Sequence, residues 1–177
     1  MGTNGSDPRL TLLADALQQY RAEYALLADR WKALETKAQG TAAIAGVFVG
    51  GIFAITRDLD ASTPVAEVWL LGVVILLLTA AILLAVRALY VRNLADPPAG
   101  FQLEQMAMDT VKLDDGSFAE ALPAVYGEQF TVWREANEDL RSAVVTKALA
   151  VWRAQFVLAG AVLLMAVICL VMVATKS

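Results

Sequence analysis

The sequence contains no histidine and a single cysteine, Cys169, among its 177 residues. Without histidine, the chain lacks the commonest general base, metal ligand and titrating switch near neutral pH. The lone cysteine cannot form a disulfide within the chain, and its place in an apolar run indicates a small hydrophobic residue. Common catalytic motifs, such as a phosphate-binding glycine loop or a paired-cysteine motif, are also missing. We therefore expect no enzymatic activity, no cofactor and no metal ion.

Charged residues are missing from three long stretches, 38–56, 68–86 and 154–175. Even the shorter stretches correspond to about 28 Å of helix, which matches a hydrocarbon core of about 30 Å. With 58% hydrophobic residues, the composition is also that of a membrane protein. We predict an all-α membrane protein with three transmembrane helices.

Apolar residues recur three and four positions apart before the first of these stretches, which is the pattern of a coiled-coil seam. The seam consists of Leu10, Leu13, Leu17, Tyr20, Tyr24, Leu27, Trp31, Leu34 and Ala38. No proline follows it, so one helix is expected to continue into the first span. Residues 129–153 have a similar apolar side and lead directly into the third span. We expect both long helices to join an oligomeric helical bundle, and the pattern leaves open whether the seam pairs within or between chains.

The turn-forming residues and charges set the expected segment boundaries. Asp7 and Pro8 suit the start of a helix, Pro97 and Pro98 end one, and the LDDGS turn at 113–117 divides an insert into two short helices. The predicted segments are a flexible tail (1–7), a cytosolic coiled-coil helix (8–37), a first span (38–56), an extracytoplasmic loop (57–65), a second span (66–92), a cytosolic helical insert (93–128), a cytosolic helix (129–153) and a third span (154–175).

Lysine and arginine are distributed unequally along the chain. Of the 14 such residues, all but Arg57 and Lys176 lie in segments 8–37 and 87–153. The positive-inside rule therefore places the N-terminus in the cytoplasm and the C-terminus on the other side of the membrane. With this topology the helices 8–37 and 129–153 both lie in the cytosol and run parallel toward the membrane.

Small residues recur at every fourth position of the first span, at Ala42, Gly46, Gly50 and Ala54. Such a stripe, which includes a GxxxG motif, lets two helices approach closely. One interpretation is packing against another span of the same chain. The other is self-association around an axis, which the heptads immediately upstream favour.

If the heptad phase of Leu34 and Ala38 continues across the membrane boundary, four residues face that axis. They are Thr41, Ala45, Phe48 and Ile52. Such a ring forms a hydrophobic constriction, and constrictions of this kind gate pores by dewetting. The alternative is that these are ordinary packing residues.

Five basic residues are candidates for binding phosphate: Arg30, Lys37, Arg134, Arg141 and Lys147. Arg30 and Lys37 share one heptad position, and Arg134 and Arg141 share another, so an oligomer repeats each as a ring of positive charge. Lys147 falls beside the apolar side of its helix. The alternatives are that Lys37 snorkels to the membrane interface, that Lys147 is exposed at the edge of the apolar side, and that the arginines lie on solvated helix faces.

Two segments of the chain resemble a known family. RWKALETKAQGTAAIAG at 30–46 and TKALAVWRAQFVLAGAVLLM at 146–165, separated by a second span and an insert with an acidic turn, are similar to SLATT-like transmembrane effectors of bacterial anti-phage defence. The resemblance covers most of residues 20–175, and Lys37 and Lys147 match the family lysines. The outline also resembles the membrane effectors of Hailong-type systems.

This resemblance implies a homo-oligomeric pore, with a tetramer favoured, gated by a nucleotide second messenger or a short oligonucleotide that a partner nucleotidyltransferase makes. It leaves open whether the ligand opens or closes the pore. Opening would depolarise the membrane. The alternative is a non-conducting, membrane-anchored coiled-coil adaptor that recruits a soluble partner, because the same heptads support it.

Overall fold

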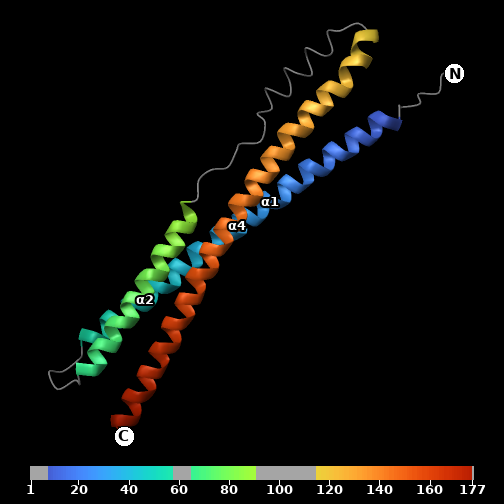
Figure 1. Ribbon diagram of the computed structural model, residues 1–177. Helices are drawn as coiled ribbons and strands as arrows, with labels where there is room; N and C mark the ends of the chain where they lie inside the picture. Colours follow the sequence, from blue (N-terminus) through green and yellow to red (C-terminus); the bar gives the residue numbers. More distant parts are fainter. Residues whose placement is uncertain (1–7, 58–64, 91–114, 177) are drawn as a thin grey trace. The chain divides into compact units, whose positions relative to one another are not determined.

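The described part of the chain is helical. The computed structural model describes residues 8–57, 65–90 and 115–176, and within these ranges it has three α-helices and no strand. Helix α1 spans Pro8–Arg57, α2 spans Val65–Leu89 and α4 spans Asp115–Lys176 (Figure 1). The all-α prediction is confirmed over these ranges. The predicted tail and the first helix of the predicted insert lie outside them.

Helix α1 joins the predicted coiled-coil segment and the first span without a break. It begins at Pro8, whose fixed φ suits the first helical position and whose missing N–H costs no hydrogen bond there. It ends at Arg57, after 50 residues. The prediction of one continuous helix from the polar segment into the uncharged run is therefore confirmed.

Helix α4 begins at Asp115, although a helix start was predicted near residue 129. The half-buried side chains of Leu122, Tyr126 and Phe130 continue one face of the helix across the predicted boundary to the buried Trp133. Pro123 lies inside the helix, where a proline normally costs about 3 kcal/mol. We infer that the packing of this uninterrupted face offsets that cost, so the second short helix of the insert is the first part of α4.

The described residues divide into two compact units. The two-helix unit contains residues 8–30 of α1 and 115–144 of α4. The three-helix unit contains residues 31–57 of α1, helix α2 and residues 145–176 of α4. Both long helices contribute to both units.

In the two-helix unit, the seam of α1 packs against α4 of the same chain. The ring of Tyr20 lies edge-on to Phe130 with centroids 5.8 Å apart, and Tyr24 lies edge-on to Trp133 at 5.7 Å. Both partners of the second ring pair follow those of the first pair along their helices, so the two segments run parallel, as predicted. Within the single chain the seam meets helix α4, and additional pairing between copies stays a prediction.

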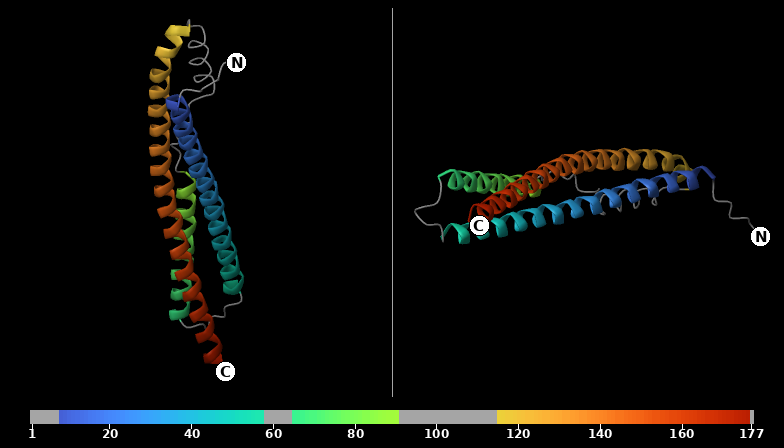
Figure 2. Two further views of the ribbon diagram at one scale, coloured as in Figure 1. Left: turned by 90° about the vertical axis from the view of Figure 1, so that its right-hand side faces the viewer. Right: turned by 90° about the horizontal axis from the view of Figure 1, so that it is seen from below.

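In the three-helix unit, all three helices contribute to one apolar core, and α2 runs antiparallel to the other two (Figure 2). The buried members are Ala45, Ile52, Leu71, Val74, Leu78, Ala161 and Ile168. A second cluster, of Ala38, Ala88 and Val151, again takes one residue from each helix. Small alanines at these contacts allow the helices to approach closely.

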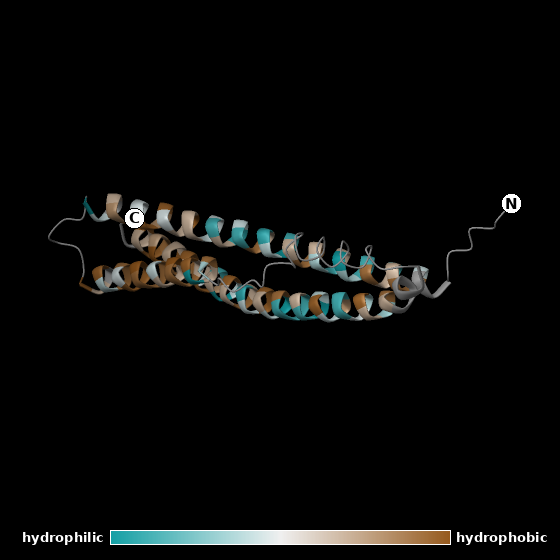
Figure 3. Cartoon of the chain, turned by 90° about the horizontal axis from the view of Figure 1, so that it is seen from above, coloured by the Kyte–Doolittle hydropathy of each residue, from teal (hydrophilic) through white to brown (hydrophobic). Residues whose placement is uncertain are grey.

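Three helices of the described ranges are long and apolar enough to cross a membrane. Helix α2 is brown or pale over most of its length in the hydropathy colouring, whereas α1 has many teal turns (Figure 3). In α4, only 11% of the most apolar window is buried within the chain. So much apolar surface has to meet lipid or another protein, which supports a membrane protein.

Candidate functional site

The four predicted gate residues lie toward the interior of the three-helix unit. Ala45 is 0% exposed, Ile52 is 1% exposed and Thr41 is 4% exposed, while Phe48 is half-buried against the same core. The hydroxyl of Thr41 donates to the carbonyl of Lys37, one turn earlier in α1. The heptad phase therefore does continue into the first span, but the residues it selects are covered by their own chain. This placement favours the packing alternative, and a pore-lining role for them stays a prediction that requires another packing of the helices.

The stripe of small residues faces mostly outward. Gly46, Gly50 and Ala54 are exposed and Ala42 is half-buried. A Cβ atom added at Gly46 or Gly50 would have no neighbour within 4 Å. Packing of the GxxxG motif against another span of the same chain, the first interpretation, is therefore not what this structure shows. The outward face leaves room for another helix.

A buried ion pair joins α1 and α4 in the three-helix unit. The Lys147 ammonium donates to the Glu35 carboxylate with a distance of 2.8 Å between Nζ and Oε1. The same ammonium lies 3.6 Å from the centroid of the Trp31 ring, a cation–π contact. Trp31 Nε1 also donates to the Glu35 carboxylate, at 2.9 Å. The three side chains form a closed cluster, which we call the Lys147 latch.

Burial of the latch is asymmetric. The Lys147 side chain is 0% exposed, whereas the Glu35 side chain is 39% exposed. An ammonium taken fully out of water requires a partner, so Lys147 depends on Glu35 more than Glu35 depends on Lys147. The expectation that Lys147 is exposed at the edge of the apolar side is wrong, because the helix turns this residue into the contact with α1. Its ammonium is committed to Glu35 and Trp31, so this structure gives no support to a phosphate contact.

The latch lowers the pKa of Glu35. The hydrogen bond from Lys147 is the main cause, and the charge of Lys147 and the bond from Trp31 add to it, while desolvation acts in the opposite direction. Glu35 lies in the charged N-terminal segment of α1, before the uncharged run 38–56 begins.

A pH dependence of stability follows from this shift. Because the folded pKa is below the ordinary value of 4.5, the ion pair contributes fully above that pH and its contribution disappears as the pH falls through the folded pKa. We expect the difference in unfolding free energy between the wild type and Glu35→Gln to be constant from pH 7 to 5 and to shrink below about pH 4.5. Unfolding in mixed micelles at each pH measures it, and a difference that grows on acidification contradicts the assignment.

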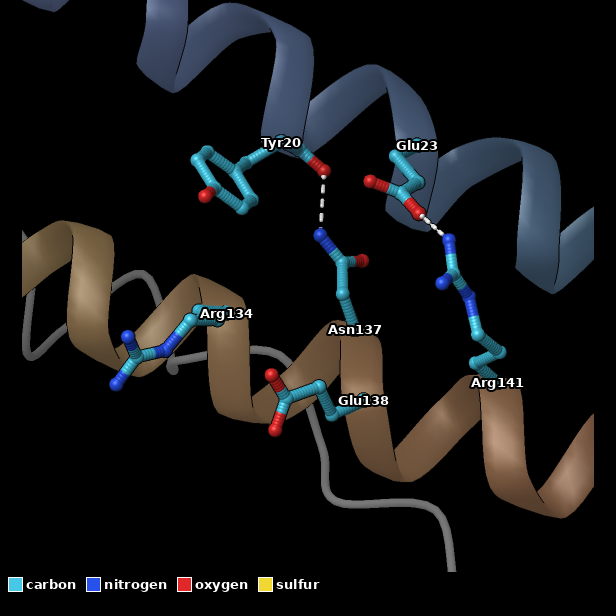
Figure 4. Close-up of a pocket in the computed structure, with 6 residues that line it drawn as sticks. All are labelled: Tyr20, Glu23, Arg134, Asn137, Glu138 and Arg141. Atoms are coloured by element: carbon cyan, nitrogen blue, oxygen red, sulfur yellow. Dashed lines mark hydrogen bonds and ion pairs between the residues drawn. The ribbon is translucent and has the colours of Figure 1, made fainter.

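A polar cleft lies between α1 and α4 in the two-helix unit (Figure 4). It encloses about 230 Å³ and is lined by Tyr20, Glu23, Arg134, Asn137, Glu138 and Arg141. Asn137 donates from Nδ2 to the Tyr20 carbonyl at 3.0 Å, and Arg141 forms an ion pair with Glu23. Both interactions cross from one helix to the other, so they fix the register of the pair.

Two buried side-chain atoms of α4 have no hydrogen-bond partner among the described residues, Asn137 Oδ1 in the cleft and Trp133 Nε1. They belong to residues one helical turn apart on α4. An unpaired buried polar group costs about 1–3 kcal/mol, so their presence between two packed helices calls for a compensating role. Asn137 is 5% exposed, which makes Oδ1 an unused acceptor in the wall of the cleft.

The structure brings together two of the five predicted phosphate ligands. Arg134 and Arg141 line the same cleft. Arg30 and Lys37 are exposed and line no part of it, and Lys147 is buried in the latch. The rings of charge predicted for an oligomer involve other copies of the chain and stay a prediction.

Sequence reasoning missed Glu35, Trp31 and Asn137 as interacting residues. Trp31 was assigned only to the seam, and Glu35 follows it by one helical turn, so their mutual bond could have been anticipated from the spacing. Asn137 lies between Trp133 and Leu140 on the apolar side of α4, and a polar residue there is a detectable signal. The pairing of Glu35 with Lys147 joins residues 112 positions apart and had no local signal.

Comparisons of the chain with protein-family models, with curated proteins and with solved structures found no match.

Proposed function

We propose that this protein is a homo-oligomeric, pore-forming effector of bacterial anti-phage defence, with a tetramer favoured, in the inner membrane. A nucleotide or oligonucleotide ligand binds its cytosolic helices, and the open pore depolarises the membrane. The observation that carries the proposal is the continuity of α1 and α4, since each helix includes residues of the two-helix unit and an uncharged run of membrane-spanning length. The family resemblance of residues 30–46 and 146–165 adds the defence context.

The outward glycine stripe supports self-association. No described residue lies within 4 Å of a Cβ atom added at Gly46 or Gly50, while the neighbouring Val47 and Phe53 are 76% and 61% exposed. Small residues flanked by large apolar ones allow a second transmembrane helix to pack closely. We therefore place the contact between copies on this face, and not on the face of Ala45 and Ile52.

The polar cleft supports binding of a phosphate group. Its two arginines donate hydrogen bonds to a phosphate, whereas the carboxylates of Glu23 and Glu138 repel one. The unused acceptor Oδ1 of Asn137 suits an N–H group of a base and not a phosphate oxygen. The volume of the cleft is below the roughly 300–1,000 Å³ of sites that enclose a drug-sized ligand, so it accommodates one phosphate or one base of a larger ligand. A phosphate has to displace Glu23 from Arg141, which makes Glu23 a competitor of the ligand.

Because Glu23 competes with the ligand, replacing Glu23 and replacing the arginines are expected to change ligand sensitivity in opposite directions. The full chain in liposomes loaded with a potassium-sensitive dye is titrated with a cyclic dinucleotide and with a short DNA oligonucleotide. We expect Arg134→Gln and Arg141→Gln each to weaken the ligand effect on ion flux about tenfold or more, because each removes a charge-assisted hydrogen bond. Glu23→Gln is expected to strengthen it.

Arg30→Gln is the matched control, because Arg30 is an exposed arginine of the same unit that does not line the cleft. It is expected to leave ligand sensitivity unchanged. Liposomes that never pass ions, with or without either ligand, overturn the pore and favour the adaptor. An equal effect of Arg30→Gln and Arg134→Gln overturns the cleft as the ligand site.

A further inference from the structure

Three exposed cations surround one level of the three-helix unit. Ala38 of α1, Ala88 of α2 and Val151 of α4 pack together there, with exposures of 0%, 0% and 2%. Lys37 and Arg87 directly precede Ala38 and Ala88, Arg153 follows Val151 by two residues, and all three basic residues are exposed. Each helix of the unit therefore carries one cation at this level.

Among the described residues, no carboxylate is paired with these cations. In the segments that flank this level, residues 31–38, 84–90 and 145–154, the one acidic residue is Glu35. Its carboxylate already accepts from Lys147 and Trp31. The described residues offer no ion pair to Lys37, Arg87 or Arg153. Because the whole chain has a net charge of −4, this local excess of positive charge does not follow from the composition.

Exposed aromatic side chains lie at the same level. Trp152 is 61% exposed and stacks on Phe156 with ring centroids 5.5 Å apart, and Tyr90 is 77% exposed. Tryptophan and tyrosine are enriched where hydrocarbon meets lipid headgroups, because each combines an apolar ring with a polar atom. The uncharged runs of all three helices lie on the same side of this level, so it corresponds to the headgroup layer.

We propose that Lys37, Arg87 and Arg153 form a binding surface for the phosphate groups of anionic lipids. The cations come from three packed helices, so lipids bound to them surround the unit and favour its assembled form. Lys37 on this basis contacts lipid and not a nucleotide. The inference depends neither on a pore nor on a soluble ligand, so it can hold where the proposed function fails.

Native mass spectrometry of the detergent-solubilised full chain tests this proposal. The chain is titrated with phosphatidylglycerol and with phosphatidylcholine of the same acyl chains. We expect tighter binding of phosphatidylglycerol, weakened about fivefold by Arg87→Gln and about a hundredfold by Arg87→Gln combined with Lys37→Gln and Arg153→Gln. Phosphatidylcholine binding is expected to change little.

Arg57→Gln is the matched control. Arg57 and Arg87 are both exposed arginines in the last turn of a membrane-spanning helix, and Arg57 lies at the end of α1 away from the three cations. Equal losses for Arg57→Gln and Arg87→Gln overturn the proposal, as does equal binding of the two lipids to the wild type. Inorganic phosphate at millimolar concentration serves as a competitor, and displacement of the lipid by it assigns the site to free phosphate and overturns a lipid surface.

Discussion

Glu35→Leu is expected to destabilise the three-helix unit by about 3 kcal/mol or more, whereas Lys147→Met is expected to cost about 1 kcal/mol. The difference follows from burial, because Lys147 is 0% exposed and Glu35 retains 39% of its side-chain exposure. Without Glu35, the ammonium is left buried with only the face of Trp31 as a partner. Without Lys147, the carboxylate turns to water and keeps its bond from Trp31.

The double variant Glu35→Leu with Lys147→Met tests whether these stability costs come from the ion pair or from side-chain packing alone. It removes both charges and leaves apolar side chains of similar size, so its stability is expected to return to within about 1 kcal/mol of the wild type. Unfolding by SDS in mixed micelles at pH 7 gives the four free energies of this cycle. Equal costs for the two single variants, or a double variant no more stable than Glu35→Leu, contradict the latch.

The faces of the helices could be predicted from the sequence, whereas their partners could not. The seam residues Leu17, Leu27 and Trp31 are buried as the heptads predicted, and the same phase continues to Ile52 in the first span. Periodicity specifies which side of a helix is covered, but it does not identify the element that covers it. The seam was compatible with copies of itself and with α4, and the structure pairs it with α4 of the same chain.

The same limit explains the gate and the glycine stripe. Ala45 and Ile52 were assigned to an axis between copies because a heptad was assumed to face a copy of itself. Once α2 and α4 cover that side, Gly46 and Gly50 are left on the outside. The start of α4 was misplaced for a different reason, since the apolar residues before 129 were assigned to a separate short helix, whereas Leu122 and Tyr126 continue the face of Trp133 in one helix.

Replacing Gly50 by leucine is expected to abolish self-association and, with it, ion flux through liposomes. The substitution adds a large side chain in the middle of the outward stripe, where two helices have to approach closely to pair. It leaves the protomer intact, because a Cβ atom at this position meets nothing within 4 Å and leucine favours a helix more than glycine does. Loss of assembly therefore cannot be attributed to loss of folding.

Gly51→Leu is the control that decides the prediction. Gly51 is also exposed and without neighbours within 4 Å, but it follows the stripe by one residue and so points about 100° away around the helix. Both variants gain the same helix propensity and the same apolar surface, and only Gly50→Leu fills the stripe. Chemical crosslinking in membranes and dye-loaded liposomes report assembly and flux for both variants. If Gly51→Leu impairs assembly as much as Gly50→Leu, or if neither does, the contact between copies lies on another face of the chain.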